Sequence, residues 1–317
     1  MRQEVAAAIA ISCMAAFVGA SANAGVVRAN DDELVPTGKG WGERPAPEAG
    51  PGQGAGQGRG DAPGQGKPKP GGNGISYHGG KLILGTTNVY YIWYGKWDGN
   101  DAPAILTDFA QNIGNSPYYN ITTTYYDGSN NHVANSVAYA GSTTDAYSRG
   151  TSLSDSAIQG VVSDAISQGR VPKDTNAVYF VLTSKDVTAS SGFCTQYCGW
   201  HTHGTIGGQD IKYSFVGNPD RCPSACAAQA MGPSGNAGAD GMASIIAHEL
   251  EEAVTDPDLN AWYDTRGYEN ADKCAWTFGT TQVAPNGSQY NMKLGNRYYL
   301  IQQNWVNAGG GSCALSY

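Results

Sequence analysis

One stretch, from Asp240 to Pro257, constrains the fold of this chain most strongly, because it carries the start, the periodicity and the stop of a single helix. Asp240 is of a residue type preferred at helix N-caps, and Pro257 disfavours helical backbone just before it, so the helix should end near Thr255. Apolar residues recur between them at helical spacing: Met242, Ile245, Ile246 and Ala253. An amphipathic helix needs a second layer over its apolar face, so the sequence predicts a packed domain around it.

The same helix carries a pattern typical of a metal site. His248 and Glu252 are four residues apart, which puts both side chains on one face, with Glu249 one position round the helix. This H-E-x-x-E pattern differs from the zinc motif H-E-x-x-H at the second ligand, and in that motif the first Glu takes a proton from metal-bound water. A carboxylate is an acceptable zinc ligand that moves the preference toward harder ions. We expect zinc, with another divalent ion as the alternative; the competing interpretation is an ordinary helix with a solvated acidic face.

Two more carboxylates follow within twenty residues of Glu252, at Glu269 and Asp272. Together with the helix they resemble the active-site segment of thermolysin-like metallopeptidases. That resemblance implies His248, Glu252 and Glu269 as the metal ligands, Asp272 as the residue that orients His248, and Glu249 as the catalytic base. Asp256, at the end of the same run, is a further candidate.

Two histidines lie in Cys198-Gly-Trp-His201-Thr-His203, two positions apart. On a strand this spacing places both on one face, where they could supply a further ligand or a substrate contact. The alternative is a polar surface loop.

The N-terminal part reads as targeting and linker sequence. Residues 1–24 combine an apolar run from Val5 to Ala20 with an A-x-A cleavage site, which is typical of a signal peptide, and no other stretch is long enough to cross a bilayer. From 45 to 74, 17 of 30 residues are Gly or Pro. We therefore expect a disordered linker or pro-segment over 25–74, a single globular domain over 75–317, and a secreted, extracellular protein.

Cysteine usage agrees with export. Removal of the signal peptide leaves an even number of cysteines, which suggests disulfides in an exported chain: Cys194, Cys198, Cys222, Cys226, Cys274 and Cys313. A zinc cluster is the weaker alternative, because oxidation competes outside the cell. The sequence cannot choose among the pairings; two local pairs and a Cys274–Cys313 bond are our expectation.

Charge excludes some classes of partner. The net charge is −8, and 25–74 holds six basic and six acidic residues, so the acidic excess belongs to the globular part. Nucleic-acid binding draws its affinity largely from basic contacts to phosphate, so we expect no nucleic-acid partner.

The order of predicted elements indicates an α/β fold. Strands are predicted at 77–84, 88–94 and 176–183, helices at 102–115 and 154–169, a glycine-rich, disulfide-pinned loop region at 190–239, and a strand at 297–303 after the metal-bearing helix. This order fits a zincin-like plan, by analogy, in which a twisted sheet and a backing helix support the metal-bearing helix.

Several segments of the chain are distinctive: Asn88-Val-Tyr-Tyr-Ile-Trp-Tyr-Gly95, Val178-Tyr-Phe-Val-Leu-Thr-Ser184, Phe193-Cys-x₃-Cys-Gly199, Cys222-Pro-x₂-Cys-Ala227 and Gly238-Ala-Asp-Gly-Met242. They resemble the phosphate-induced protein family, the EXORDIUM-like proteins of plant cell walls and their microbial relatives. The resemblance implies secretion and an extracellular, apoplast or wall setting. We expect a microbial-type member that retains the H-E-x-x-E helix.

Three functions follow as hypotheses. The first is a secreted metal-dependent hydrolase, similar to zinc metallopeptidases, acting on a peptide or a cell-wall substrate. The second is a non-catalytic extracellular or cell-wall-associated protein that acts by binding. The third is a carbohydrate-active enzyme with Glu249 and Asp272 as paired carboxylates and no metal. The sequence does not determine the oligomeric state.

Overall fold

The computed structural model describes residues 26–30, 33–36, 39 and 74–317. The predicted signal peptide and most of the predicted linker lie outside these residues. Within 25–74 the structure places an antiparallel hairpin of β1 (Val26–Asn30) and β2 (Glu33–Pro36), which the composition had not indicated. Lys39 follows it, and its ammonium group bonds Asp155 and lies over the rings of Tyr197 and Trp200.

A five-stranded sheet in the order β5-β4-β7-β10-β9 forms the centre of the domain. Its strands are β4 (Thr87–Tyr94), β5 (Val137–Asp145), β7 (Ala177–Thr183), β9 (Gly199–Ile206) and β10 (Gln209–Val216). Four of them are parallel, and the edge strand β9 runs antiparallel to β10. All seven residues of β7 are buried, as expected for a strand covered on both faces. The expected α/β class with a central sheet is confirmed.

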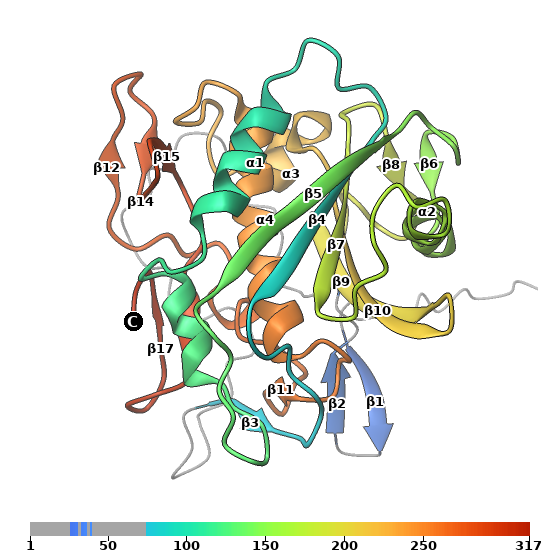
Figure 1. Cartoon of the computed structure of the whole chain (residues 1–317). Helices are drawn as coiled ribbons and strands as arrows, with labels where there is room; N and C mark the ends of the chain where they lie inside the picture. The colour runs from blue at the N-terminus through green and yellow to red at the C-terminus, as the bar shows by residue number, and fades with distance from the viewer. Residues whose placement is uncertain (1–25, 31–32, 37–38, 40–73) are drawn as a thin grey trace, which may run out of the picture.

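Helices cover both faces of this sheet. Figure 1 shows α1 (Ala102–Asn112) and α4 (Ala237–Thr255) on one side and α2 (Asp155–Ser167) on the other. The predicted helices at 102–115 and 154–169 are present, and Gly169 adopts the positive φ of +67° that lets the chain leave α2.

The central helix begins earlier than predicted. Asn236, not Asp240, is its N-cap, since the Asn236 side chain accepts a hydrogen bond from the backbone N–H of Ala239. Asp240 lies in the first turn and accepts hydrogen bonds from the backbone and hydroxyl of Ser234. The end at Thr255 is as predicted.

The predicted loop region at 190–239 contains two strands of the sheet, β9 and β10. Their connection is Gly207-Gly208, with φ of +56° and +76°, the backbone of a two-residue hairpin turn that favours glycine. The polar residues of β9, among them His201 and His203, interrupt the alternation of apolar and polar residues by which a strand is predicted. The Gly-Gly pair between two short runs was the available signal.

The remaining elements are short and frame the helix ends and the C-terminal part. The predicted strands at 77–84 and 297–303 shrink to β3 (Ser76–Tyr77) and β15 (Arg297–Tyr299), because most of their residues pair with no other strand. The short elements are η1 (Tyr119–Thr124), η2 (Pro219–Arg221), α3 (Pro223–Cys226), η3 (Asp272–Cys274) and the strand pairs β3 (Ser76–Tyr77) with β11 (Trp262–Tyr263), β6 (Ser152–Leu153) with β8 (Thr188–Ala189), β12 (Gln282–Val283) with β13 (Gln289–Tyr290), β14 (Met292–Leu294) with β15 (Arg297–Tyr299), and β16 (Asn304–Val306) with β17 (Ser312–Ala314).

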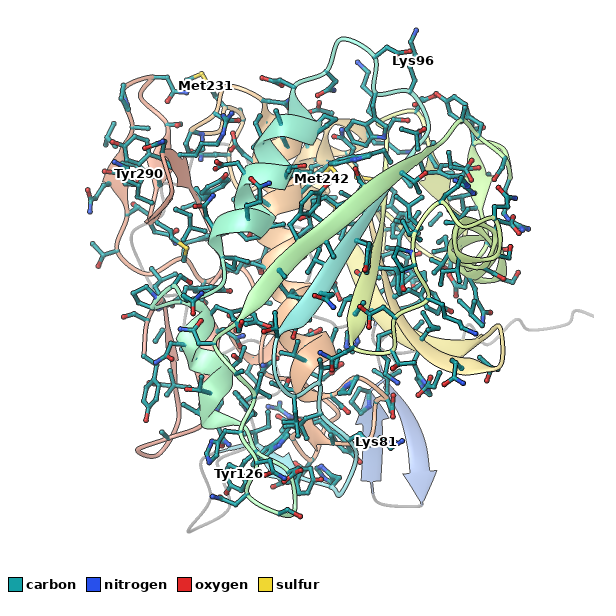
Figure 2. All side chains as sticks on the ribbon, in the orientation of Figure 1. Lys81, Lys96, Tyr126, Met231, Met242 and Tyr290 are labelled. Atoms are coloured by element: carbon teal, nitrogen blue, oxygen red, sulfur yellow. A yellow bond between two sulfur atoms is a disulfide. The ribbon has the colours of Figure 1, made fainter. Side chains whose placement is uncertain are left out.

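Apolar side chains fill the space between the sheet and α1 and α4. Figure 2 shows Met242 of α4 in the interior, and this residue is fully buried. Tyr91 of β4 is also fully buried and donates its hydroxyl hydrogen to the carbonyl of Leu106 in α1. This shared core fixes α4 against the sheet.

The disulfides are Cys194–Cys222, Cys198–Cys226 and Cys274–Cys313. The Cys274–Cys313 expectation is confirmed, and the expectation of two local pairs is wrong. The hairpin supplies the reason: Gly199 at the start of β9 is paired with Val216 at the end of β10, so the segments before and after the hairpin lie side by side. Cysteines of one segment therefore meet those of the other.

We predict that the two parallel disulfides stabilise the domain cooperatively. A Cys194→Ser, Cys222→Ser variant should lose about 2.5 kcal/mol of unfolding free energy, because the second bond still closes nearly the same loop. Replacing all four cysteines should cost about 6 kcal/mol, more than the sum of the two separate losses. Denaturant unfolding measures both values, and peptide mapping checks the pairing.

The Cys274→Ser, Cys313→Ser variant is the matched control, because its bond closes a separate loop and its cost should simply add to either loss. A Cys194–Cys198 linkage in the wild-type protein would contradict the structure.

Candidate functional site

Helix α4 carries its acidic residues into the interior. Exposure of Glu249, Glu251 and Glu252 is 0% each, and that of His248 is 1%. The interpretation of α4 as an ordinary helix with a solvated acidic face is therefore wrong. Nε2 of His248 lies 3.0 Å from Oε1 of Glu252, as the four-residue spacing predicts.

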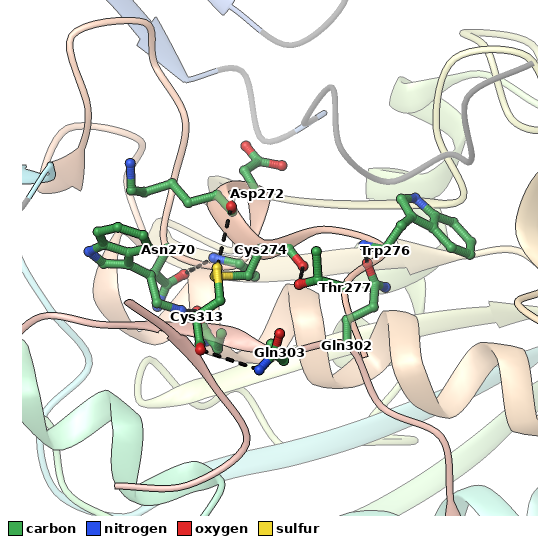
Figure 3. The surroundings of a disulfide bond; sticks show 12 residues. Asn270, Asp272, Cys274, Trp276, Thr277, Gln302, Gln303 and Cys313 are labelled. Carbon is green, nitrogen blue, oxygen red and sulfur yellow. Dashed lines mark hydrogen bonds between the residues drawn. A yellow bond between two sulfur atoms is a disulfide. The ribbon is translucent and has the colours of Figure 1, made fainter. Parts of the chain in front are cut away.

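The segment after β11 brings further carboxylates to this helix. Asp272 donates its backbone N–H to Oε1 of Glu252 at 3.0 Å, and its Oδ1 lies 3.6 Å from Nε2 of His248. Figure 3 shows Asp272 beside Cys274, whose disulfide to Cys313 ties this segment to the C-terminal strands. The disulfide thus helps to hold Asp272 against α4.

The edge strand β9 supplies a second histidine. Nε2 of His201 lies 3.1 Å from Oε1 and 3.2 Å from Oε2 of Glu269, and 3.8 Å from Oε2 of Glu252. His201 and Glu269 are each 1% exposed. The structure therefore brings together five residues that we call the central cluster: His201, His248, Glu252, Glu269 and Asp272.

Within the central cluster, Glu269 and Asp272 contact other partners than the peptidase resemblance implies. Glu269, expected to complete the site of His248, lies against His201. Asp272, expected only to orient His248, presents an oxygen to the same nitrogen of His248 as Glu252 does.

The other candidates lie outside this cluster. His203 contacts Asp210 at 2.8 Å and Asp258 at 3.7 Å, and the ammonium group of Lys212 bonds both carboxylates, which supplies their compensating charge. Oδ1 of Asp256 accepts the backbone N–H groups of Asn260 and Ala261 at 2.6 Å each. Asp256 therefore closes the turn after α4, and burial raises its pKa to about 7.

Burial sets the charge state of the central cluster. It lowers the pKa of His201 to about 4, so this imidazole is neutral and has a lone pair for a metal. It also raises the pKa of Glu252, an effect that His248 opposes. Buried carboxylates without compensation are costly, and a divalent cation is the compensation that this donor set suits.

Glu249 faces the edge strand. A Cβ atom built on Gly199 of β9 would lie 3.1 Å from Oε1 of Glu249 and 2.5 Å from Cγ2 of Ile245. The absence of a side chain at Gly199 therefore lets α4 approach β9 closely, with Glu249 against the strand.

Sequence reasoning gave no role to Glu251, the third glutamate of the helix. Neither of its carboxyl oxygens has a hydrogen-bond partner among the described residues, and burial raises its pKa well above the ordinary value. Burial and then Glu251 raise the pKa of Tyr118 and of Tyr125. A glutamate in an acidic run gives no sequence signal that it faces tyrosines.

Comparison with known proteins identifies the family. The family described as the phosphate-induced protein 1 conserved region matches residues 75–314. The chain belongs to this family. It is 32% identical over 273 residues to EXORDIUM-like 5 of Arabidopsis thaliana, covering 73% of this chain and 75% of the relative. PHOSPHATE-INDUCED 1 of Nicotiana tabacum is 30% identical over 225 residues, covering 60% and 67%.

No solved structure matches the chain. Among the residues that the structure describes, no helix is both long and apolar enough to span a membrane.

We predict that Gly199→Ala destabilises the domain by about 1–3 kcal/mol, because its Cβ meets Ile245 and the carbonyl of Phe215, which is 2.9 Å away. Gly204→Ala on the same strand is the control, since its Cβ meets chiefly the end of the Gln159 side chain, which can rotate away. That control should change stability by about 0.5 kcal/mol or less. Thermal and denaturant unfolding compare the two; equal stabilities would contradict the close approach of α4 to β9.

Proposed function

We propose that this chain is an exported extracellular protein of the EXORDIUM-like type, that its central cluster binds divalent metal, and that the protein acts by binding rather than by catalysis. The observation that carries the proposal is burial: His201, His248 and Glu269 are each 1% exposed and Glu252 is 0% exposed. A hydrolytic metal site needs a position open to substrate, whereas a structural site is closed by protein ligands.

Distances within the central cluster fit metal ligation. Ligands at 2.0–2.2 Å from a tetrahedral ion lie roughly 3.3 Å from one another. The separations of His248 from Glu252 and Asp272 are 3.0 and 3.6 Å, and those of His201 from Glu269 and Glu252 are 3.1 and 3.8 Å. An ion there would join α4, β9 and the segment around Asp272, so its binding energy would stabilise the fold.

Export is supported by the three disulfides, which persist in oxidising compartments, and by the signal-peptide pattern of residues 1–24. The chain shares its family with EXORDIUM-like 5 and PHOSPHATE-INDUCED 1, and it is the resemblance to this family that implies secretion and an extracellular or wall setting. The proposed setting is an extracellular or wall surface.

Metal removal should lower the stability of the mature protein. At a free metal concentration of about 100 Kd, binding contributes roughly 2.7 kcal/mol, so chelation should lower Tm by about 5–10 °C. His248→Ala should lower the metal content measured by elemental analysis and weaken the effect of the chelator on Tm. His203→Ala, outside the cluster, should leave both unchanged; a wild-type protein without metal after reconstitution would contradict the proposal.

A metal-dependent hydrolase, similar to zinc metallopeptidases, is the second candidate. Glu249 follows His248 on α4 and lies against β9, and the sheet with its antiparallel edge strand beside this helix fits the zincin-like plan by analogy. A bound ion would supply Lewis acidity. Glu249 would accept a proton from the attacking water at its carboxylate and deliver it to the leaving amine.

Glu249→Gln separates the two candidates. For a binding protein, the variant should match the wild type in metal content and stability, and neither protein should cleave a peptide library. For a hydrolase, the wild type should cleave peptides, and the variant should be slower by at least about 10²-fold with its metal retained. Mass spectrometry of the library after incubation detects cleavage.

A further inference from the structure

We infer that the central cluster holds two divalent cations bridged by the carboxylate of Glu252. The inference rests on the proposed metal site and specifies its composition. It comes from the way the ligand atoms divide: His248, Glu252 and Asp272 converge as one set, and His201, Glu252 and Glu269 as another, with Glu252 common to both.

The two oxygens of Glu252 serve different sets. Oε1 lies 3.0 Å from Nε2 of His248, and Oε2 lies 3.8 Å from Nε2 of His201. A carboxylate that offers one oxygen to each of two ions is a bridging ligand, and ions in two-metal sites lie about 3.5–4 Å apart. Each ion would then have one histidine, one carboxylate of its own and one oxygen of Glu252.

A single ion would use this cluster poorly. Ligands at 2.0–2.2 Å from one ion lie within about 4.4 Å of one another, and the five residues form two convergent sets rather than one. One ion bound by His248 and Asp272 would leave His201 and Glu269 without a role in binding it.

Unsatisfied oxygens point into both sets. Oε2 of Glu252 and Oδ1 of Asp272 accept no hydrogen bond from the described residues, although the Glu252 side chain is 0% and the Asp272 side chain 3% exposed. These are the same atoms that face His201 and His248. Each set thus contains a buried acceptor that a cation would satisfy.

The test is the metal stoichiometry of the full mature protein after reconstitution with Mn²⁺ or Zn²⁺. We expect two ions per chain in the wild type, one in His201→Ala and one in His248→Ala. Glu252→Ala should lose both ions, because it removes the bridge. Glu251→Gln is the matched control on the adjacent helix position and should retain two.

A spectroscopic measurement on the unmutated protein covers the case in which a variant fails to fold. Two Mn²⁺ ions on one carboxylate should give an exchange-coupled EPR spectrum, whereas one Mn²⁺ gives the spectrum of an isolated ion. One ion in the wild type with an isolated-ion spectrum would overturn this inference and leave the proposed metal site standing. Absence of any bound metal would overturn both.

Discussion

The structure depends on the near-complete burial of α4, in which only Ala237 and Gly241 are partly exposed. A helix enclosed on all sides is ordinarily apolar all round, yet this one carries His248 and three glutamates with exposures of 1% or less. Its polar face therefore has to find partners inside the protein. Strand β9 and the segment around Asp272 provide these partners, and both lie against α4. Their contacts compensate polar side chains of the helix whose burial would otherwise be costly.

The β9–β10 hairpin links the sheet to this polar interior. One face of β9 carries His201 to the cluster, the absence of a side chain at Gly199 admits α4, and the paired ends of the hairpin bring four cysteines together. A change in the register of this single hairpin by one residue would turn His201 to the opposite face and separate it from Glu269. The position of the second histidine is thus fixed by strand pairing.

Signals within short stretches of the sequence predicted the features that depend on neighbouring residues alone. The end of α4 at Thr255 follows from Pro257, and the buried strands β4 and β7 follow from β-branched and aromatic runs. The disulfide pairing and the division of Glu269 and Asp272 between two histidines depend on contacts between distant segments. The N-cap is Asn236 rather than the predicted Asp240, because the helix begins about one turn earlier than predicted. The carboxyl group of Asp240 accepts a hydrogen bond from the Ser234 hydroxyl instead.

Cysteines flank the ligands of the central cluster: Cys198 precedes His201 by three positions, and Cys274 follows Asp272 by two. Bonds at these cysteines persist in oxidising compartments and are rare in the reducing cytosol. On the proposed function, that of an exported protein that binds metal, a newly made chain would lack these covalent anchors of β9 and Asp272 before export. Oxidation would come first and ion capture second, so such a protein would take its metal from the extracytoplasmic supply and carry none out of the cytosol.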